Sequence, residues 1–322
     1  METSINTSQT LTLNAQWQNC LTTAHDAAGK QSYPASTLYV VATPIGNLAD
    51  ISLRALHVLN IVDAIACEDT RHTQPLLRTY GITVGNNAGH SAENKKSMLA
   101  VHEHNELEAT EHIIARLQRG ERIAFVSDAG TPGVSDPGSK LVAGVRAAGL
   151  RVMPLPGASS VTTLLSVAGV IQSDQFTFLG FLPSKTMERD TAVLKLQAIP
   201  GSIVLLEAPH RIEAVAKALG ILGDRLITIG RELTKQFEEI ATIAAAHFSA
   251  WLAQDSNRAR GEFVLVLHPL TVVVENEDAP RVLKLLLAEL PLKTAVKLAS
   301  DITGAPRNAL YDAALRLKEK PL

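Results

Sequence analysis

The stretch SDAGTPGVSDPG, residues 127–138, follows directly on the apolar run Ile123–Val126. It contains three glycines, two prolines and two aspartates, and it has almost no side-chain bulk. Gly, Pro, Asp and Ser are the usual turn-forming residues, so a simple turn is one interpretation. The other is a loop that presents main-chain groups to a ligand, because open α/β sheets bind ligands at the carboxyl ends of their strands.

Strand and helix patterns alternate around this loop. The runs TLYVVA (37–42), IVDAIACED (61–69), RIAFV (122–126) and RVMPLPG (151–157) are typical of strands, and helical patterns lie between them. We expect Asp50 to cap the first of these helices and Gly81–Lys96 to form a surface loop. Such alternation indicates parallel βαβ units with helices on both faces of the sheet.

Three loops rich in Gly and Pro each follow a predicted strand. They are TPIGN (43–47), SDAGTPGVSDPG and PLPGASS (154–160). In a parallel sheet all three lie at the same edge, so we expect them to converge on one crevice. Small residues there let a ligand approach main-chain N–H and C=O groups.

The second half predicts another α/β domain, beginning near Pro156. Its expected strands are FTFLGFLP (176–183), SIVLLEAPH (202–210), RLITIGREL (225–233) and EFVLVLHP (262–269), and AAAHFSAWLAQ (244–254) is among the expected helices. The tail is helical, with Gly304 and Pro306 at the turn of a predicted helix-turn-helix. The predicted organisation is therefore a flexible extension at 1–36, α/β domains at 37–155 and 156–270, and a helical tail at 280–322.

Composition restricts the class of protein. The chain of 322 residues is 46% hydrophobic and 19% charged, which is typical of a globular protein. A net charge of −2 argues against coating of nucleic acid through bulk charge. The two cysteines form no disulfide framework or zinc site, which favours the cytoplasm, and no apolar run approaches the length of about 18–20 residues that spans a membrane.

Several familiar motifs are absent. There is no G-x-x-x-x-G-K-[ST] phosphate loop, the glycines of SDAGTPGVSDPG do not fit G-x-G-x-x-G, and GASSV lacks the last glycine of a nucleophile elbow. His102 and His104 of HEHNE (102–106) indicate a polar network rather than a metal site, because no third ligand is evident. We expect no metal.

The motifs resemble one family. LYVVATPIGNLADISLRAL, CEDTRHT, HEHNE, SDAGTPGVSDPG, PLPGASS, GFLP, EAPHR, RELTKQFEE and GEFVLVL occur in the order seen in ribosomal RNA small-subunit methyltransferase I, which is similar to the tetrapyrrole methylases. The resemblance covers Leu38–Leu267, continues less sharply into PRNALYDAAL near the end, and excludes the first 36 residues. Gly133 and Val134 replace bulkier aliphatics, and the loop at 81–96 is longer than the family's usual connection.

The resemblance implies two α/β domains of the tetrapyrrole methylase type, the class III methyltransferases, with a cofactor cleft between them and a small helical C-terminal region. It implies S-adenosylmethionine as cofactor and a decoding-centre cytidine of 16S rRNA, methylated on its ribose 2′-hydroxyl, as substrate. The residues it implies for cofactor binding are Pro44, Asp128, Ala129, Gly130, Thr131, Pro156, Gly157, Ala158, Ser159, Ala208 and Glu262.

Three of the polar residues near these loops have competing interpretations. Asp136 in SDPGS is expected to cap the following helix rather than contact the cofactor. Asp128 fits loop fixation and cofactor contact equally, and Ser159 fits capping of the helix that follows it.

A ribose hydroxyl is a poor nucleophile until its proton is partly removed, so a general base is expected. Candidates at strand ends are Glu68, Asp69, Glu207, His210 and Glu232. Cations that could contact RNA or the reacting hydroxyl are Arg71, Lys185, Arg211, Arg231, Lys235 and, in the locally basic tail, Arg307. Glu68 with Arg71, and Glu207 with Arg211, could equally be structural ion pairs.

The expected partners are 16S rRNA or the 30S subunit, bound by the tail at phosphates while FLPSK (181–185) and HEHNE shape the nucleotide entrance. The resemblance also implies a homodimer and no membrane partner. Two alternatives remain open: a methyltransferase acting on a porphyrinoid carbon, and a non-catalytic RNA-binding or ribosome-assembly protein. The TPIGN loop, where porphyrinoid enzymes carry the glycine-richer G-x-G-P-G-D, disfavours the first of these.

Overall fold

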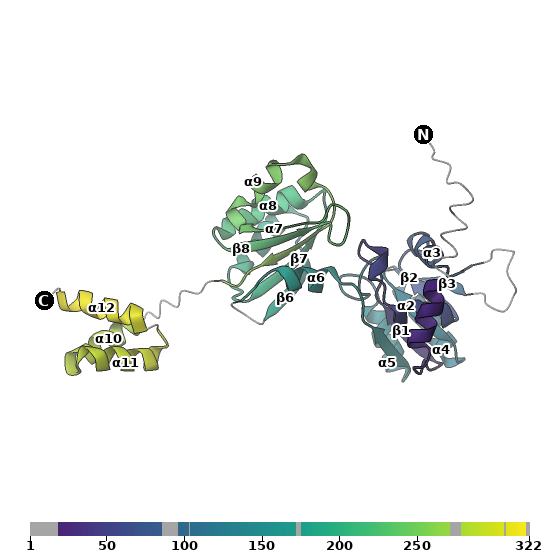
Figure 1. Cartoon of the computed structure of the whole chain (residues 1–322), viewed down its shortest axis with the longest axis horizontal. Helices are drawn as coiled ribbons and strands as arrows, with labels where there is room; N and C mark the ends of the chain where they lie inside the picture. The colour runs from purple at the N-terminus through teal and green to yellow at the C-terminus, as the bar shows by residue number, and fades with distance from the viewer. Residues whose placement is uncertain are drawn as a thin grey trace.

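The computed structural model describes residues 19–85, 96–102, 104–171, 175–270, 278–305 and 307–319 (Figure 1). Several sequence-based expectations lie outside these ranges. They are the first part of the expected extension (1–18), most of the expected loop (86–95), Glu103 of HEHNE, the linker before the tail (271–277), Pro306 and the last residues (320–322).

The first domain is built on a parallel sheet with the strand order β3-β2-β4-β1-β5. Alternate residues of the central strands point to opposite faces: Val41 and Ala124 pack in one core cluster, whereas Leu38 and Phe125 pack in the other. The predicted parallel sheet covered on both faces is confirmed (Figure 1). Its elements are β1 (Thr37–Val41), α2 (Leu53–Ile61), β2 (Ala64–Cys67), α3 (Thr70–Thr79), β3 (Ser97–Ala100), α4 (Glu106–Gln118), β4 (Arg122–Val126), α5 (Ser139–Ala147) and β5 (Arg151–Leu155).

Two local expectations for this domain were wrong. Ser52, not Asp50, caps α2, since its hydroxyl accepts from the amide of Ala55 at 3.1 Å. Part of the expected flexible extension is folded: residues 19–28 are helical, and Ala24 is fully buried in the same cluster as Tyr39 and Leu77. The alanines on one side of this helix bury apolar surface. The polar composition of the segment as a whole did not indicate this.

The second domain has a mixed sheet with the order β6-β7-β10-β8-β9. Only β6 and β7 are parallel, and the other pairs are antiparallel. The strand β9 was not predicted, because its half-exposed residues EIATIA precede an alanine-rich run that we assigned to a helix. The elements are α6 (Ser160–Val167), β6 (Phe176–Phe181), α7 (Thr186–Leu196), β7 (Ser202–Glu207), α8 (Ile212–Leu219), β8 (Leu226–Arg231), β9 (Glu239–Ala244), α9 (Phe248–Ala253) and β10 (Phe263–Leu267).

Two layers of apolar side chains cover this sheet. Ile203 and Leu205 pack with α7, α8 and α9 on one face. On the other face, Val204 and Val264 pack with Leu164 of α6. The helix α6 follows the last strand of the first sheet but packs on the second sheet, so the chain crosses between the domains just before it.

Among its described residues, the C-terminal region has three helices: α10 (Asp278–Glu289), α11 (Leu292–Thr303) and α12 (Arg307–Glu319). Leu283, Val296 and Leu310 belong to a core made only of residues from this region. Gly304 ends α11 in the left-handed conformation, with φ +72°, which agrees with the predicted turn. Within the described ranges, no helix combines the length and apolar character that crossing a membrane requires.

Candidate active site

The three glycine- and proline-rich loops meet at one edge of the first sheet. Their strands β4, β1 and β5 are neighbours, so the loops leave the sheet side by side. Thr43 and Gly130 exchange two main-chain hydrogen bonds of 2.9 and 3.0 Å, and the Thr131 hydroxyl donates to the carbonyl of Ala158 at 3.1 Å. The predicted convergence is confirmed, and the three loops form a single connected wall.

Two glycines make this close approach possible. Gly130 has φ +81°, a backbone conformation that favours glycine. A Cβ on Gly157 would lie 2.8 Å from the Cβ of Ala42, closer than two carbon atoms approach. Small residues are therefore required to hold the loops together, as well as to expose main chain to a ligand.

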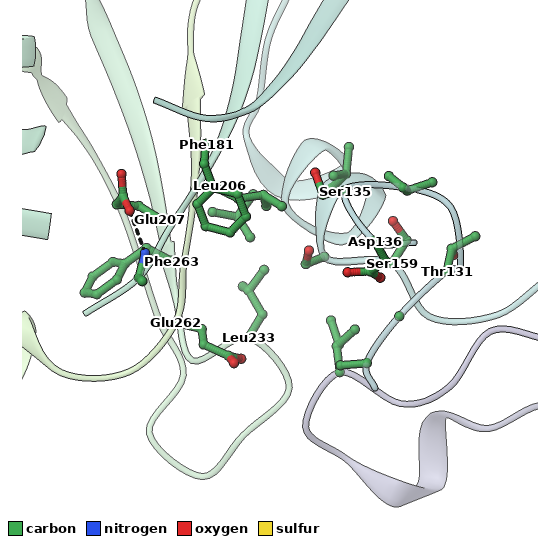
Figure 2. Close-up of a pocket in the computed structure, with 18 of the residues that line it drawn as sticks. Thr131, Ser135, Asp136, Ser159, Phe181, Leu206, Glu207, Leu233, Glu262 and Phe263 are labelled. Atoms are coloured by element: carbon green, nitrogen blue, oxygen red, sulfur yellow. Dashed lines mark hydrogen bonds between the residues drawn. The ribbon is translucent and has the colours of Figure 1, made fainter. Parts of the chain in front are cut away.

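A cavity of about 300 Å³ lies between this wall and the second domain (Figure 2). We call it the interdomain pocket. Apolar residues from both domains line much of it, among them Ile45, Leu206 and Val264, and its polar residues include Asp136, Glu207 and Glu262. An apolar cavity with a few convergent polar groups is typical of a small-molecule site.

The structure places the predicted cofactor residues in two groups. The residues that line the pocket are Ala129, Gly130, Thr131, Ser159, Ala208 and Glu262, and those that do not are Pro44, Asp128, Pro156, Gly157 and Ala158. Members of the second group support the wall: Pro44 is buried beside Ile45, which does line the pocket. The sequence did not single out Ile45 or Leu233, since apolar residues near a pocket look like ordinary core or surface residues. Phe181 entered only as the first residue of FLPSK, which we expected to shape the nucleotide entrance, and Val134 only as a departure from the family.

Asp136 lines the pocket and does not cap α5, so the expected capping role was wrong. The cap position of α5 is Gly138, and the carboxylate of Glu106 occupies the helix N-terminus instead. One oxygen of Glu106 accepts from the amides of Gly138 at 3.0 Å and Lys140 at 3.1 Å. Because a buried carboxylate from α4 serves the helix, Asp136 is free to face the pocket. The last residue of HEHNE thus has a structural role that its sequence context did not indicate.

Acidic side chains gather behind Asp136. Burial, followed by the nearby charges of Glu68 and Asp128, raises the pKa of Asp136 to about 6. Burial, and then the charge of Asp128, also raises the pKa of Glu68. The imidazole Nδ1 of His72 lies 3.1 Å from Asp128, and this contact raises the pKa of His72. The pKa of Asp136 therefore lies well above that of an ordinary carboxyl group.

Asp69 has a different role from the one we considered. Its carboxylate caps α3 through the amide of Arg71 and pairs with the Arg71 guanidinium at 2.7 Å. Hydrogen bonds from Arg71 lower the pKa of Asp69 to about 2, which makes it a poor base. Arg71 pairs with Asp69 and not with Glu68, so the Glu68–Arg71 pair considered from the sequence was wrong.

Glu207 lies in the wall of the second domain with its side chain only 1% exposed. Its Oε1 is 3.1 Å from Nε of Arg211, which confirms the structural ion pair considered from the sequence. Its Oε2 has no hydrogen-bond partner among the described residues. Burial raises the pKa of Glu207, opposed by the amide of Ala208 and by Arg211. This carboxylate is therefore a buried, structural part of the second domain's wall.

The remaining base candidates are less suited to proton transfer. Burial opposes ionisation of Glu232, but Lys235 and the amide of Glu262 hold its pKa below the usual value. Lys235 Nζ lies 2.9 Å from Glu232 and 3.0 Å from Glu262, so the three charged side chains form one network that includes the pocket residue Glu262. His210 is exposed and does not line the pocket.

The predicted RNA-contacting cations differ in accessibility. Arg231 is buried, donating to the carbonyls of Arg260 at 2.7 Å and Phe237 at 3.2 Å, so the expectation that it contacts RNA was wrong. Arg211 is also largely occupied, since it pairs with Glu207 and donates to the carbonyl of Leu182. Arg71, Lys185 and Arg307 are exposed, each beside one carboxylate.

Neither histidine of HEHNE lies in a metal site. Their ring centroids are 6.2 Å apart. The amide of His102 donates to the side chain of Asn105 at 2.8 Å, which fixes the turn before α4. Among the described residues, no group of three or more His, Cys, Asp and Glu side chains is arranged to hold a metal ion.

Comparison with known proteins assigns the family. A family model described as Tetrapyrrole (Corrin/Porphyrin) Methylases matches residues 37–248, and one described as RsmI C-terminal HTH domain matches residues 273–318. The methyltransferase CobJ superposes with a TM-score of 0.51 at 16% identity, covering 72% of this chain and 94% of CobJ. A cobalt precorrin-4 methyltransferase gives a TM-score of 0.50 at 15% identity, covering 72% and 95%. At these identities the solved structures show the fold alone.

Full-length relatives are much closer in sequence. "Ribosomal RNA small subunit methyltransferase I" of Escherichia coli O157:H7 is 45% identical over 282 residues, which is 86% of this chain and 94% of the relative. The protein of the same name from Pseudomonas aeruginosa is 45% identical over 292 residues, which is 89% of this chain and 99% of the relative. The chain therefore belongs to the ribosomal RNA small subunit methyltransferase I family, on a tetrapyrrole methylase fold.

Proposed function

We propose that the protein transfers a methyl group from S-adenosylmethionine to the ribose 2′-hydroxyl of a decoding-centre cytidine in 16S rRNA. The observation that carries this proposal is the interdomain pocket, in which main-chain-rich loops face apolar side chains and carboxylates across one cavity. The names of the relatives with 45% identity support ribosomal RNA as the substrate. We further expect action in the cytoplasm as a homodimer.

The residues present fit this cofactor. The nucleoside part needs apolar walls and main-chain hydrogen bonds, and Ile45, Leu206 and Val264 together with the loop Ala129–Thr131 offer both. The sulfonium and the amino group carry positive charge, and the acidic residues Asp136, Glu207 and Glu262 are among those that line the cavity. When bound, S-adenosylmethionine supplies a methyl group on a positively charged sulfur.

The protein's main task is to hold the hydroxyl oxygen in line with the methyl group, since positioning accounts for much of the rate in such a transfer. The second task is to take the hydroxyl proton. Asp136 is the best-placed group for this, because it lines the pocket and its pKa of about 6 leaves it ionised but basic at neutral pH. Burial, and then the nearby charge of Glu68, keeps the pKa of Asp136 raised.

RNA approaches the open side of the pocket in this proposal. Lys185 is exposed on the loop after β6, and Arg307 is exposed on α12. Such cations contact phosphates and position the RNA without reading its sequence. The helical tail, which has its own core, therefore acts as an RNA-binding unit.

The proposal is tested by incubating the full chain with S-adenosylmethionine labelled on the methyl group. Separate reactions receive unmethylated 30S subunits, free 16S rRNA or a porphyrinoid. We expect label on the 2′-oxygen of a cytidine, located by mass spectrometry of nuclease fragments. Label on the macrocycle would select the porphyrinoid alternative, and binding of rRNA without any transfer would select a non-catalytic RNA-binding protein.

A further inference from the structure

One aromatic side chain of the interdomain pocket stays open to solvent. Phe181, the last residue of β6, lines the pocket and is 51% exposed. Aromatic residues make up only 4% of the chain, and an exposed phenylalanine costs free energy by leaving apolar surface in water. Figure 2 shows its ring beside Leu206, on the second domain's side of the pocket.

A β-bulge aims Phe181 at the pocket. In the pairing of β6 with β7, Phe178 lies opposite Val204, but Gly180 lies opposite Leu205 and Phe181 opposite Leu206. The extra residue shifts the alternation by one position, so Phe181 shares the face of Val204 and Leu206. In an unbroken strand it would point to the opposite face, which packs against α7 and α8. Gly180 takes φ +67°, a conformation that suits glycine, and so permits the bulge.

Hydrogen bonds from two arginine side chains hold the main chain after Phe181 in place. The Arg211 guanidinium donates to the carbonyl of Leu182, and Arg189, which is buried, donates to the carbonyl of Ser184 at 3.1 Å. On the other side of the bulge, a Cβ on Gly180 would lie only 3.1 Å from the Ser135 hydroxyl of the first domain. The ring is therefore presented by a fixed main chain, as a preorganised binding element needs to be.

We propose that Phe181 is the platform on which the base of the target nucleotide stacks when its ribose enters the pocket; this inference rests on the proposed function. Enzymes that act on one nucleotide move it out of the helical stack and receive its base on aromatic side chains. The deeper apolar residues Leu233 and Val264 are each only 5% exposed, whereas Phe181 faces the entrance, four residues before the exposed Lys185. The ring thus fits the RNA base, and the buried floor fits the cofactor.

The test compares Phe181→Leu, Phe181→Tyr and Phe176→Leu in the full chain. Phe176 is the matched control: it belongs to the same strand, lies on the same face, is also 51% exposed, and does not line the pocket. For each variant the measurements are the KM for 30S subunits, kcat, the Kd for S-adenosylmethionine, and the Tm. Loss of one base stack predicts a KM about 5- to 150-fold higher for Phe181→Leu.

The other expected results are an unchanged cofactor Kd for all three variants, and nearly normal KM for Phe181→Tyr and Phe176→Leu, because tyrosine keeps the flat ring. A weaker cofactor Kd with an unchanged KM would instead make Phe181 part of the cofactor wall and overturn the inference. Equal KM values for Phe181→Leu and Phe176→Leu would overturn it as well. If the unaltered protein methylates no rRNA at all, the proposed function fails first, and the inference fails with it.

Discussion

On the first-domain side of the interdomain pocket, the wall is main chain held by main chain. Thr43 pairs with Gly130 through amides and carbonyls, and glycines permit the contact. On the second-domain side, long charged side chains hold the wall. Arg211 pairs with Glu207 and reaches the carbonyl of Leu182, and Lys235 joins Glu232 to Glu262.

The difference shows which substitutions each wall tolerates. In the first wall, function depends on the absence of side chains, so adding even one carbon is harmful. In the second, it depends on partners distant in the sequence, so removing a side chain leaves a buried group without its partner. The five predictions below test this contrast, beginning with the one carboxylate that the first wall contributes to the chemistry.

Asp136→Asn has the largest expected effect. Loss of a general base lowers kcat by about 10²–10⁴-fold. In the unaltered protein, kcat falls as the pH drops through about 6, because Asp136 becomes protonated. The variant lacks this acid limb, which a pH–rate profile in single-turnover reactions shows directly. A variant with normal kcat, or one that keeps the limb, would assign proton transfer to another group.

The same variant tests how much the buried carboxylate of Asp136 lowers the free energy of unfolding. The folded state disfavours the ionised form of a carboxyl group whose pKa is raised there. The free energy of unfolding therefore falls as the pH rises through about 6 and Asp136 ionises. Asp136→Asn should therefore be more stable than the unaltered protein above pH 6, by about 1–2 kcal/mol after allowance for contact with solvent. Urea unfolding at pH 5 and pH 8 measures this, and the two proteins should differ less at pH 5.

Gly138→Ala is the next largest and probes the first wall. Gly138 has φ +123°, and a Cβ there would lie 2.2 Å from the ring of Phe125. Backbone strain and overpacking together predict a loss of about 2–6 kcal/mol in the free energy of unfolding. Gly133→Ala is the matched control. Gly133 has φ +79° in the same loop, but a Cβ there would lie no closer than 3.9 Å to a neighbouring side chain. It should lose only about 1–2 kcal/mol; equal losses would mean that packing against Phe125 is unimportant.

Arg211→Met probes the second wall. It leaves the carboxylate of Glu207 buried without its cation and the Leu182 carbonyl without its donor. We expect a loss of about 3 kcal/mol in the free energy of unfolding, together with weaker cofactor binding in calorimetry. Lys217→Met, on an exposed position of the same helix, should be nearly neutral. If the two variants are alike, side-chain contacts do not hold this wall.

Deletion from Asp278 onward has the smallest expected effect on the pocket itself. The deleted helices have a core of their own, so the Kd for S-adenosylmethionine should remain unchanged. Binding of 30S subunits should weaken about tenfold or more, with a shallower salt dependence, because phosphate contacts are lost. Filter binding at several salt concentrations provides the measurement. Unchanged affinity for rRNA would contradict the RNA-binding role of the tail.

The sequence by itself determined the first wall and four of the five strands of the first sheet, all except β3. Runs such as RIAFV (122–126) have the apolar character of buried strands, and Gly and Pro mark the loops that follow them. Because parallel strands end at one edge, local pattern was enough to predict that the three loops converge; the contacts of Thr43 with Gly130 and of Thr131 with Ala158 come from the structure. The helical tail was predicted for the same reason, since 3.6-residue periodicity and a Gly-Pro turn are local signals.

Only the tertiary structure decided the roles of the charged residues. Asp136 resembles a helix cap in sequence, but Glu106, 30 or so residues earlier, caps the helix and leaves Asp136 in the pocket. Arg231 resembles an RNA contact, yet it is buried against the carbonyl of Arg260. The orientation of Phe181 depends on a bulge that the spacing of apolar residues does not reveal. Backbone conformation follows from near neighbours, whereas a charge takes its role from whichever partners folding brings within hydrogen-bonding distance.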